Sequence, residues 1–241
     1  MKILVLGDIH DYLRPLSIIF KYAYNSDAQF VLITGDFGVK EHSLRFVSNL
    51  LSEYNWIGVS VYGNHEPKLI INNAQRGLSL GSLRILAMGE IIEHFGLSIL
   101  GICGNRGSGR KWSHWRDSII IGIINRVSGR RIDLVLSHEM PLGLADNCRG
   151  TKSCGQKVLR LLVEKLKPRL YIGGHLHTYP QYAELRNTLI VKVGGISNKG
   201  FLEGHSFFAL VDIRKDRVCV LSYEYYGGRI RRLWKAAVCL T

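Results

Sequence analysis

Long apolar runs, paired cysteines and an even balance of charge are what this 241-residue sequence lacks. No run reaches the roughly 18 apolar residues of a membrane-spanning helix, so we expect no such segment. The five cysteines form no C-x-x-C pair, and we assign none of them to a metal. Cys148 and Cys154 lie close enough for a local disulfide, but reduced cysteines are the expectation for a cytoplasmic protein.

Neither a leader segment nor a domain boundary is evident. The chain passes from Met1 directly into a strand-like run ending at Asp8, so a cleavable signal peptide would remove the first polar motif. We therefore expect a cytoplasmic location. No repeat or low-complexity linker divides the chain, and residues 1–241 are expected to form one domain.

Basic residues outnumber acidic ones, 32 to 19, which gives a formal net charge of +13. The excess is concentrated between Arg76 and Arg131 and in the tail between Arg229 and Lys235. A positive field attracts polyanions, so a phosphate-ester substrate and nucleic acid are both candidate partners. The sequence indicates no oligomeric state.

Apolar runs that end abruptly at polar motifs fill the first half of the chain. They are Lys2–Gly7, Phe30–Thr34 and Ile57–Tyr62, and helix-like spacing lies between them at 15–25 and 41–53. This alternation is typical of buried parallel strands in β-α-β units. The motifs recur every 28 residues, so we expect them at one edge of one sheet, where the carboxyl ends of the strands form a ligand crevice.

The second half shows shorter and more varied elements, which predict a second sheet. The expected elements are two strands about a turn (Leu83–Met88, Leu97–Cys103), a helix (Trp112–Val127), a strand (Asp133–Ser137), a helix (Gly155–Leu166), a strand (Leu170–Ile172) and an antiparallel meander (189–194, 206–213, 218–225).

Carboxylate, imidazole and amide side chains follow these strands in short motifs. The motifs are Asp8-Ile9-His10, Gly35-Asp36, Gly63-Asn64-His65-Glu66, His138 and Gly174-His175-Leu176-His177. These side chains offer the oxygen and nitrogen donors that a pair of divalent cations needs. Two cations sharing a carboxylate are suited to the hydrolysis of phosphate esters.

The ordered set of motifs resembles the pattern of the calcineurin-like metallophosphoesterase superfamily, in its small prokaryotic and archaeal form. The resemblance implies an α/β fold, a four-layer α/β/β/α sandwich with two mixed sheets. It also implies two groups of metal ligands around a bridging Asp36, one formed by Asp8, His10 and His177 and the other by Asn64, His138 and His175.

By the same resemblance, the protein hydrolyses phosphate mono- or diesters by attack of a metal-activated water. His65 is then expected to act as a catalytic acid and not as a ligand, while Glu66 orients a neighbouring group. The ligand set suits Mn²⁺, Fe or Zn²⁺, and two Mn²⁺ ions are our expected cofactors.

Two alternatives stay open beside this prediction. The motifs at Asp36 and Asn64 also resemble those of RNA lariat debranching enzymes, which favours a nuclease acting on DNA or RNA; those enzymes, however, carry cysteine where Asp8 stands. The other alternative is a non-catalytic metal-binding scaffold, as in the retromer subunit with this fold. His65 argues against it, because a scaffold has no need of an acid beside the ligands.

The stretch from Cys103 to Arg116 is rich in glycine, cations and tryptophan. Its glycines allow the backbone to bend around an anion, its cations can pair with phosphates and Trp112 can stack on a ring. We therefore expect it to overhang the metals and bind substrate through Arg106, Arg110, Lys111 and Trp112. A surface loop without function is the alternative.

Overall fold

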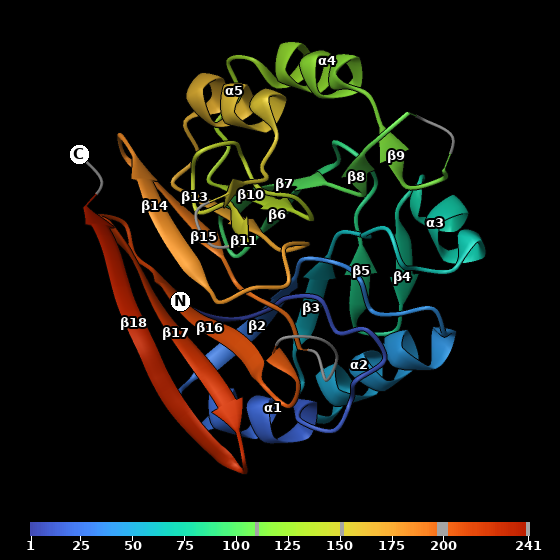
Figure 1. Ribbon diagram of the computed structural model, residues 1–241, viewed down its shortest axis with the longest axis vertical. Coiled ribbons are helices and arrows are strands. Elements are labelled where there is room, and N and C mark those ends of the chain that lie inside the picture. Colours follow the sequence, from blue (N-terminus) through green and yellow to red (C-terminus); the bar gives the residue numbers. More distant parts are fainter. Residues whose placement is uncertain (109–110, 150–151, 197–201, 240–241) are drawn as a thin grey trace.

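Two large mixed sheets organise the chain (Figure 1), and the computed structural model describes residues 1–108, 111–149, 152–196 and 202–239. The first sheet has eight strands, and its four central ones are parallel. In spatial order these strands are β18 (Arg229–Cys239), β17 (Arg217–Tyr226), β16 (Ser206–Ile213), β1 (Lys2–Leu6), β2 (Ala28–Ile33), β3 (Ile57–Ser60), β5 (Leu83–Ile85) and β4 (Leu78–Leu80).

The second sheet has six strands, of which the inner four are parallel. In spatial order they are β14 (Gln181–Leu185), β15 (Thr188–Lys192), β13 (Leu170–Gly173), β10 (Leu134–Ser137), β7 (Leu97–Ile102) and β6 (Ile91–His94). Two short pairs stand apart from it, β8 (Asn105–Arg106) with β9 (His114–Trp115) and β11 (Asn147–Arg149) with β12 (Lys152–Ser153).

Five helices are described. They are α1 (Leu16–Asn25), α2 (Glu41–Glu53), α3 (Lys68–Ala74), α4 (Asp117–Val127) and α5 (Lys157–Leu166). In Figure 1, α1 and α2 lie beside the first sheet, and α4 and α5 lie beside the second. No helix in these parts of the chain has the length and hydropathy of a membrane crossing, and the cytoplasmic location stays a prediction.

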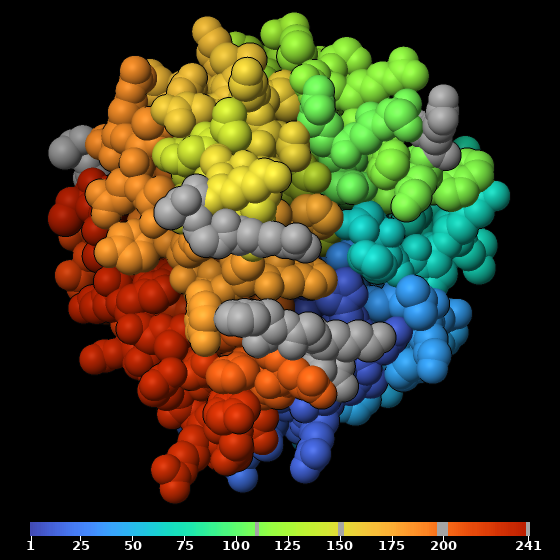
Figure 2. Space-filling view, in the orientation of Figure 1, coloured from blue at the N-terminus to red at the C-terminus, as the bar shows by residue number. Residues whose placement is uncertain are grey.

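The alternation of side chains along β10 shows how the layers pack. Leu134 and Leu136 point into a core shared with the first sheet, whereas Val135 belongs to a second core with α4 and α5. Both faces of this strand are therefore covered, as in other buried parallel strands. In the space-filling view of Figure 2, α4 and α5 lie at the top of the surface, and β17 and β18 (red) lie at its lower left. The predicted sandwich of two mixed sheets is confirmed.

The structure corrects the prediction for the strands after residue 83. β5 joins the first sheet, whereas β7 lies in the second and pairs with β6, so the two predicted strands are not partners across one turn. The meander also divides: β15 belongs to the second sheet, and β16 to β18 extend the first. The reason is the open edge of β1, which pairs with β16 because an unpaired buried edge would leave its polar groups unsatisfied.

The predicted start of the third long helix, at Trp112, is also wrong. The chain is still extended at His114 and Trp115, which pair with β8, and the helix begins at Asp117. Trp115 is buried against the second core. Burial of this indole therefore outweighs the local preference for an earlier helix start.

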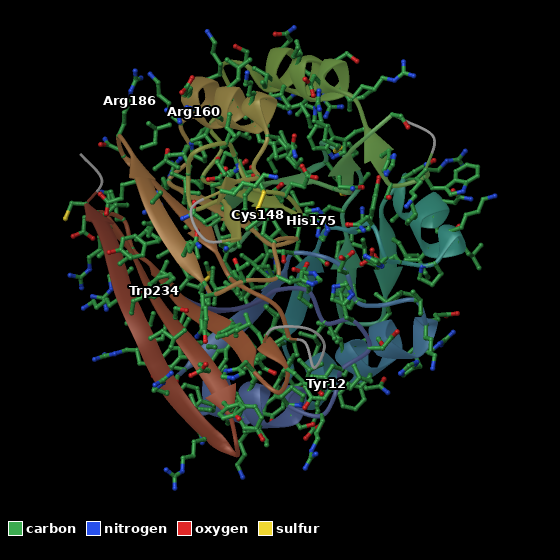
Figure 3. The ribbon with its side chains drawn as sticks, viewed as in Figure 1. Tyr12, Cys148, Arg160, His175, Arg186 and Trp234 are labelled. Carbon is green, nitrogen blue, oxygen red and sulfur yellow. A yellow bond between two sulfur atoms is a disulfide. The ribbon has the colours of Figure 1, made fainter. Side chains whose placement is uncertain are left out.

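The expectation of reduced cysteines is contradicted at one pair. Cys148 and Cys154 form a disulfide with Cα atoms 5.9 Å apart, visible as the yellow bond in Figure 3. The strands β11 and β12 pair in antiparallel fashion, and this places the two residues on facing sides of a narrow hairpin. The physical reason is the local geometry of the hairpin, which brings the two sulfur atoms within bonding distance. The expectation of reduced cysteines rested on cellular location alone and did not consider this geometry.

Candidate metal centre

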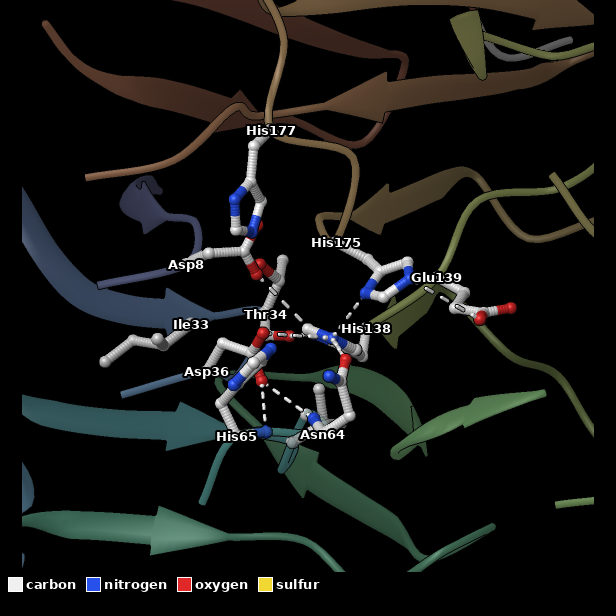
Figure 4. A network of polar contacts seen from close by, with 12 residues as sticks. Asp8, Ile33, Thr34, Asp36, Asn64, His65, His138, Glu139, His175 and His177 are labelled. Atoms are coloured by element: carbon white, nitrogen blue, oxygen red, sulfur yellow. Dashed lines mark hydrogen bonds and ion pairs between the residues drawn. The ribbon is translucent and has the colours of Figure 1, made fainter. Parts of the chain in front are cut away.

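The polar motifs meet where the parallel strands of both sheets end. Asp8, Asp36 and Asn64 follow β1, β2 and β3, while His138 and His175 follow β10 and β13. Parallel strands bring their carboxyl ends to one edge, and the packing of the two sheets sets the two edges against each other. Figure 4 shows the resulting cluster, with His177 entering from the loop after β13.

One half of the cluster gathers around His10. Its Nε2 lies 2.9 Å from Nε2 of His177 and 3.6 Å from Oδ2 of Asp36. Nε2 of His177 lies 3.6 Å from Oδ2 of Asp8. The structure thus brings together the residues predicted for the first ligand group.

The other half gathers around His138. Its Nε2 lies 3.1 Å from Oδ1 of Asn64, 3.1 Å from Nδ1 of His175 and 3.5 Å from Oδ2 of Asp36. The same oxygen of Asp36 therefore faces a histidine of each group. All seven predicted ligands lie in this cluster.

Hydrogen bonds fix which ring nitrogens face the cluster. Nδ1 of His138 lies 2.7 Å from the carbonyl oxygen of Thr34, which can only accept, so Nδ1 carries the proton and Nε2 presents its lone pair. Nε2 of His175 points toward the buried carboxylate of Glu139 at 3.9 Å, which leaves Nδ1 on the cluster side. Each imidazole is thus oriented as a ligand.

The backbone around Asp36 is bent to serve its carboxylate. The N–H groups of Asn64 and His65 donate to Oδ1 of Asp36 at 2.7 and 2.9 Å, so only Oδ2 remains available to a cation. Asp36 and His10 both have positive φ, 53° and 49°. Such left-handed conformations cost energy outside glycine and occur where a functional site requires them.

Glu66 joins two of the motif loops. Its Oε1 accepts the N–H of Phe37 at 3.0 Å, and its Oε2 accepts the N–H of Gly63 at 2.9 Å. Burial and the charge of Asp36 raise the pKa of Glu66 to about 8. The side chain of Glu66 thus holds the loop that carries Asp36 against the loop that carries Asn64.

The donor set fits divalent cations. Both carboxylate oxygens of Asp8 and Oδ2 of Asp36 are buried and have no hydrogen-bond partner among the described residues. Burial lowers the pKa of His10 to about 4 and that of His175 to about 3, so these rings are neutral and can bind a metal. Burial and the charge of Asp36 raise the pKa of Asp8 well above its usual range, a cost that cations would remove.

His65 lies at the rim of the cluster. Its side chain is exposed, and its ring centroid lies 5.0 Å from that of His10. It belongs to neither group of three donors that could hold an ion among the described residues. Its place is therefore beside the predicted ligands and not among them.

The predicted substrate-binding stretch begins next to the cluster, because the N–H of Gly104 donates to the carbonyl of Tyr62 at 2.7 Å. Within it, the guanidinium of Arg106 is held by both oxygens of Asp117, at 2.6 and 3.2 Å. Trp112 is 56% exposed. Lys111 is exposed as well, and Arg110 lies outside the described residues.

Two lysines near the site escaped the sequence prediction. The ammonium of Lys68 lies 3.9 Å from the ring centre of Trp112, and its position just after the third motif was an available signal. Lys192 is buried in β15 and donates to the carbonyl of Asn147 at 2.9 Å and to the hydroxyl of Thr178, next to His177. Burial lowers its pKa to about 8. Lys192 therefore connects the loop that carries His177 to the hairpin that carries the disulfide, a contact that no local sequence pattern indicates.

Comparisons with known proteins indicate a family and a fold. Residues 1–179 match the family described as calcineurin-like phosphoesterase. No curated protein matches the chain. A solved archaeal phosphodiesterase is similar, with 16% identity, a TM-score of 0.54 and coverage of 97% of this chain and 99% of that one.

Two further solved structures share the fold. A dimetal phosphatase from Danio rerio is 12% identical, with a TM-score of 0.61 and coverage of 100% of this chain and 99% of that one. Vps29 from Entamoeba histolytica, complexed with Zn²⁺, is 15% identical, with a TM-score of 0.54 and 99% of each chain covered. At these identities the likeness concerns the fold alone.

Proposed function

The chain belongs to the calcineurin-like phosphoesterase family, and we propose that it hydrolyses phosphate mono- or diesters at a pair of divalent cations. The observation that carries this proposal is the position of Asp36. Its Oδ2 lies 3.6 Å from Nε2 of His10 and 3.5 Å from Nε2 of His138, so one oxygen can serve both ligand groups.

Under this proposal, Asp8, His10 and His177 hold one cation, Asn64, His138 and His175 hold the other, and Asp36 is shared. Cations bound there would supply positive charge at the phosphoryl oxygens and a water of lowered pKa. The donor set suits Mn²⁺, our first choice, as well as Fe or Zn²⁺.

The surrounding residues keep these donors in place. Thr34 fixes the ring of His138 through its carbonyl, and the N–H groups of Asn64 and His65 hold one oxygen of Asp36. Glu66 holds the two loops together. Such preorganised donors reduce the reorganisation needed when charge develops on the phosphoryl group.

His65 is the residue we assign to proton transfer. Its ring stands at the exposed rim of the cluster, beside His10, and belongs to neither group of metal donors. Imidazole can give up a proton near neutral pH, which suits a leaving alkoxide or phenoxide. The ligands can still bind metal without it.

We assign substrate selection to the stretch from Gly104 to Arg116. Lys111 and Trp112 are exposed there, and Lys68 adds a cation against the indole. The guanidinium of Arg106 is held by Asp117, and the backbone N–H of Arg106 donates to Glu139 at 3.1 Å. Arg106 therefore contributes more to the shape of this stretch than to a phosphate contact. A ring-bearing ester would find stacking and charge together at this rim.

A nuclease is the alternative that an observation favours, namely the net charge of +13. The scaffold alternative, for which Vps29 provides a structural parallel, predicts metal binding without hydrolysis. The exposed His65 beside the ligands weighs against it.

The test compares hydrolysis of p-nitrophenyl phosphate and bis(p-nitrophenyl) phosphate before and after metal-stripped protein receives Mn²⁺. His65→Ala is expected to lose turnover by about 10²–10⁴-fold while keeping its metal. His42→Ala is the matched control, because His42 is exposed on α2. A metal-loaded wild type with no activity on either ester would support the scaffold instead.

A further inference from the structure

A basic cleft lies at the end of the second sheet opposite the metal centre. It has a volume of about 680 Å³, and the charged residues that line it are Arg131, Glu164, Lys167, Arg169, Arg186 and Lys215. The connections entering β10, β13 and β15 and the turn after β16 meet there. Figure 3 shows Arg186 at the outer tip of the β14–β15 hairpin, far from the labelled His175.

The carboxylates near this cleft are already neutralised. Asp133, just behind the wall, lies 2.7 Å from Arg131 and 3.8 Å from Arg169. The carboxylate of Glu164 lies 2.9 Å from the guanidinium of Arg160, on the preceding turn of α5. The negative charges thus find partners locally, and they leave the remaining cations of the cleft uncompensated.

Three exposed cations of the cleft, Lys167, Arg186 and Lys215, have no ion pair or side-chain hydrogen bond to any described residue. Two of them occupy positions of positive φ, 49° for Lys167 and 54° for Arg186. Turn geometry does not explain their identity, because asparagine or glycine adopts such conformations more readily. Their charge is therefore the property to be explained.

Arg169 makes the cleft a built site and not only a group of solvated side chains. Its Nη2 donates to the backbone carbonyls of Arg214 and Lys215, which joins the β16–β17 turn to the connection before β13. Its Nε is buried and has no hydrogen-bond partner among the described residues. Arg169 thus holds the wall of the cleft in shape, and the exposed Lys167, Arg186 and Lys215 are the cations that an anion can reach.

The positive surface extends beyond the cleft. A neighbouring hollow of about 550 Å³ shares Arg131 and adds Arg130 and Lys165. Together the two hollows are lined by seven cationic side chains, more than a single phosphate group needs. Among the described residues, the walls of both hollows hold no aromatic side chain on which an unpaired base could stack.

We propose that this basic cleft and the adjoining hollow bind the phosphate backbone of duplex nucleic acid. Cations spread along a surface neutralise successive phosphates and release counterions, which gives binding without sequence preference. Single strands are usually held by stacking on aromatic side chains, which this surface lacks. The proposal concerns a surface remote from the metal ligands and does not depend on the reaction there.

The test is fluorescence anisotropy with a labelled 20-base-pair DNA duplex at 50 to 200 mM salt, with the probe checked for intactness afterwards. Five cations of the two hollows have no carboxylate partner among the described residues: Lys167, Arg186, Lys215, Arg130 and Lys165. If each contacts one phosphate, the slope of log K against log salt is about −4.5, hence a loss of about 500-fold over this range. Lys167→Ala/Arg186→Ala/Lys215→Ala should reduce the slope to about −1.8, a loss of about 10-fold.

The control variant Lys21→Ala/Arg76→Ala/Lys235→Ala removes the same charge from exposed positions elsewhere and should keep the wild-type slope. Hydrolysis of the chromogenic esters should be unchanged in both variants, which separates this proposal from the function of the metal centre. Equal affinity and slope for the two triple variants would overturn the proposal, as would tighter binding of a single strand of the same length.

Discussion

Glu66 joins the loops that carry Asp36 and Asn64, so its replacement tests how the centre is held in shape. Both of its carboxylate oxygens accept buried backbone N–H groups, from Phe37 at 3.0 Å and from Gly63 at 2.9 Å. Glu66→Ala leaves both donors without an acceptor. Glu66→Gln keeps one acceptor oxygen and sets an NH₂ group against the other donor.

The size of the effect follows from these two bonds. Each buried donor left unsatisfied costs about 1–3 kcal/mol, so Glu66→Ala should lower the free energy of unfolding by about 2–6 kcal/mol. Glu66→Gln should lose roughly half as much, since one bond survives. For a chain of this length, each kcal/mol lowers Tm by roughly 2–4 °C.

Urea unfolding of the metal-free protein measures the stability, and a titration with Mn²⁺ measures the consequence for the site. We expect affinity for the metal to fall by about 10–100-fold, as for other residues that orient ligands. Glu184→Ala, at an exposed position of β14, is the control and should change stability by less than about 0.5 kcal/mol. The reasoning is refuted if Glu66→Ala unfolds at the same urea concentration as the wild type.

Three further predictions follow from other parts of the molecule. In Gly63→Ala the added methyl would meet the carboxylate of Asp36, so the variant should lose about 1–3 kcal/mol in urea unfolding and bind less metal; wild-type metal content would contradict this. Burial lowers the pKa of Lys192 to about 8 from 10.5, so the unfolded chain holds this proton more tightly and stability should rise between these pH values. Lys192→Met should lack that rise when urea unfolding is measured across this pH range. A stability profile identical to that of the wild type would show that Lys192 is not its cause. Burial opposes ionisation of Glu224, but hydrogen bonds from His205 and Arg231 outweigh it and lower the pKa, so this stabilisation should be lost as pH falls below 4.5; chemical unfolding of Glu224→Gln should show a smaller loss.

The convergence of the metal motifs could be predicted from sequence because it follows from strand geometry. Asp8, Asp36 and Asn64 each stand just past a buried strand, and parallel strands carry such residues to one edge. The shorter elements of the second half predicted the second sheet, and the resemblance to a known family added the grouping of the histidines. No local pattern gave the hydrogen bond from His138 to Thr34, which depends on how the two sheets face each other.

The features that sequence did not predict depend on partners distant along the chain. β16 joins β1 because that edge needs covering, and an antiparallel meander does not state which edge it will cover. In the sequence, Lys192 has no feature that distinguishes it from other strand residues. Only the fold brings Asn147 and Thr178 to its ammonium group. The basic cleft is assembled from separate connections, each with only one or two cations.

The most direct test of the shared carboxylate is the number of Mn²⁺ ions bound per chain, together with the electron paramagnetic resonance spectrum of the loaded protein. Two ions joined through Asp36 predict a stoichiometry of two and an exchange-coupled spectrum, with the coupling and the esterase activity lost together in Asp36→Ala. A single ion per chain, or two ions whose spectra stay uncoupled in the wild type, would contradict a dinuclear centre.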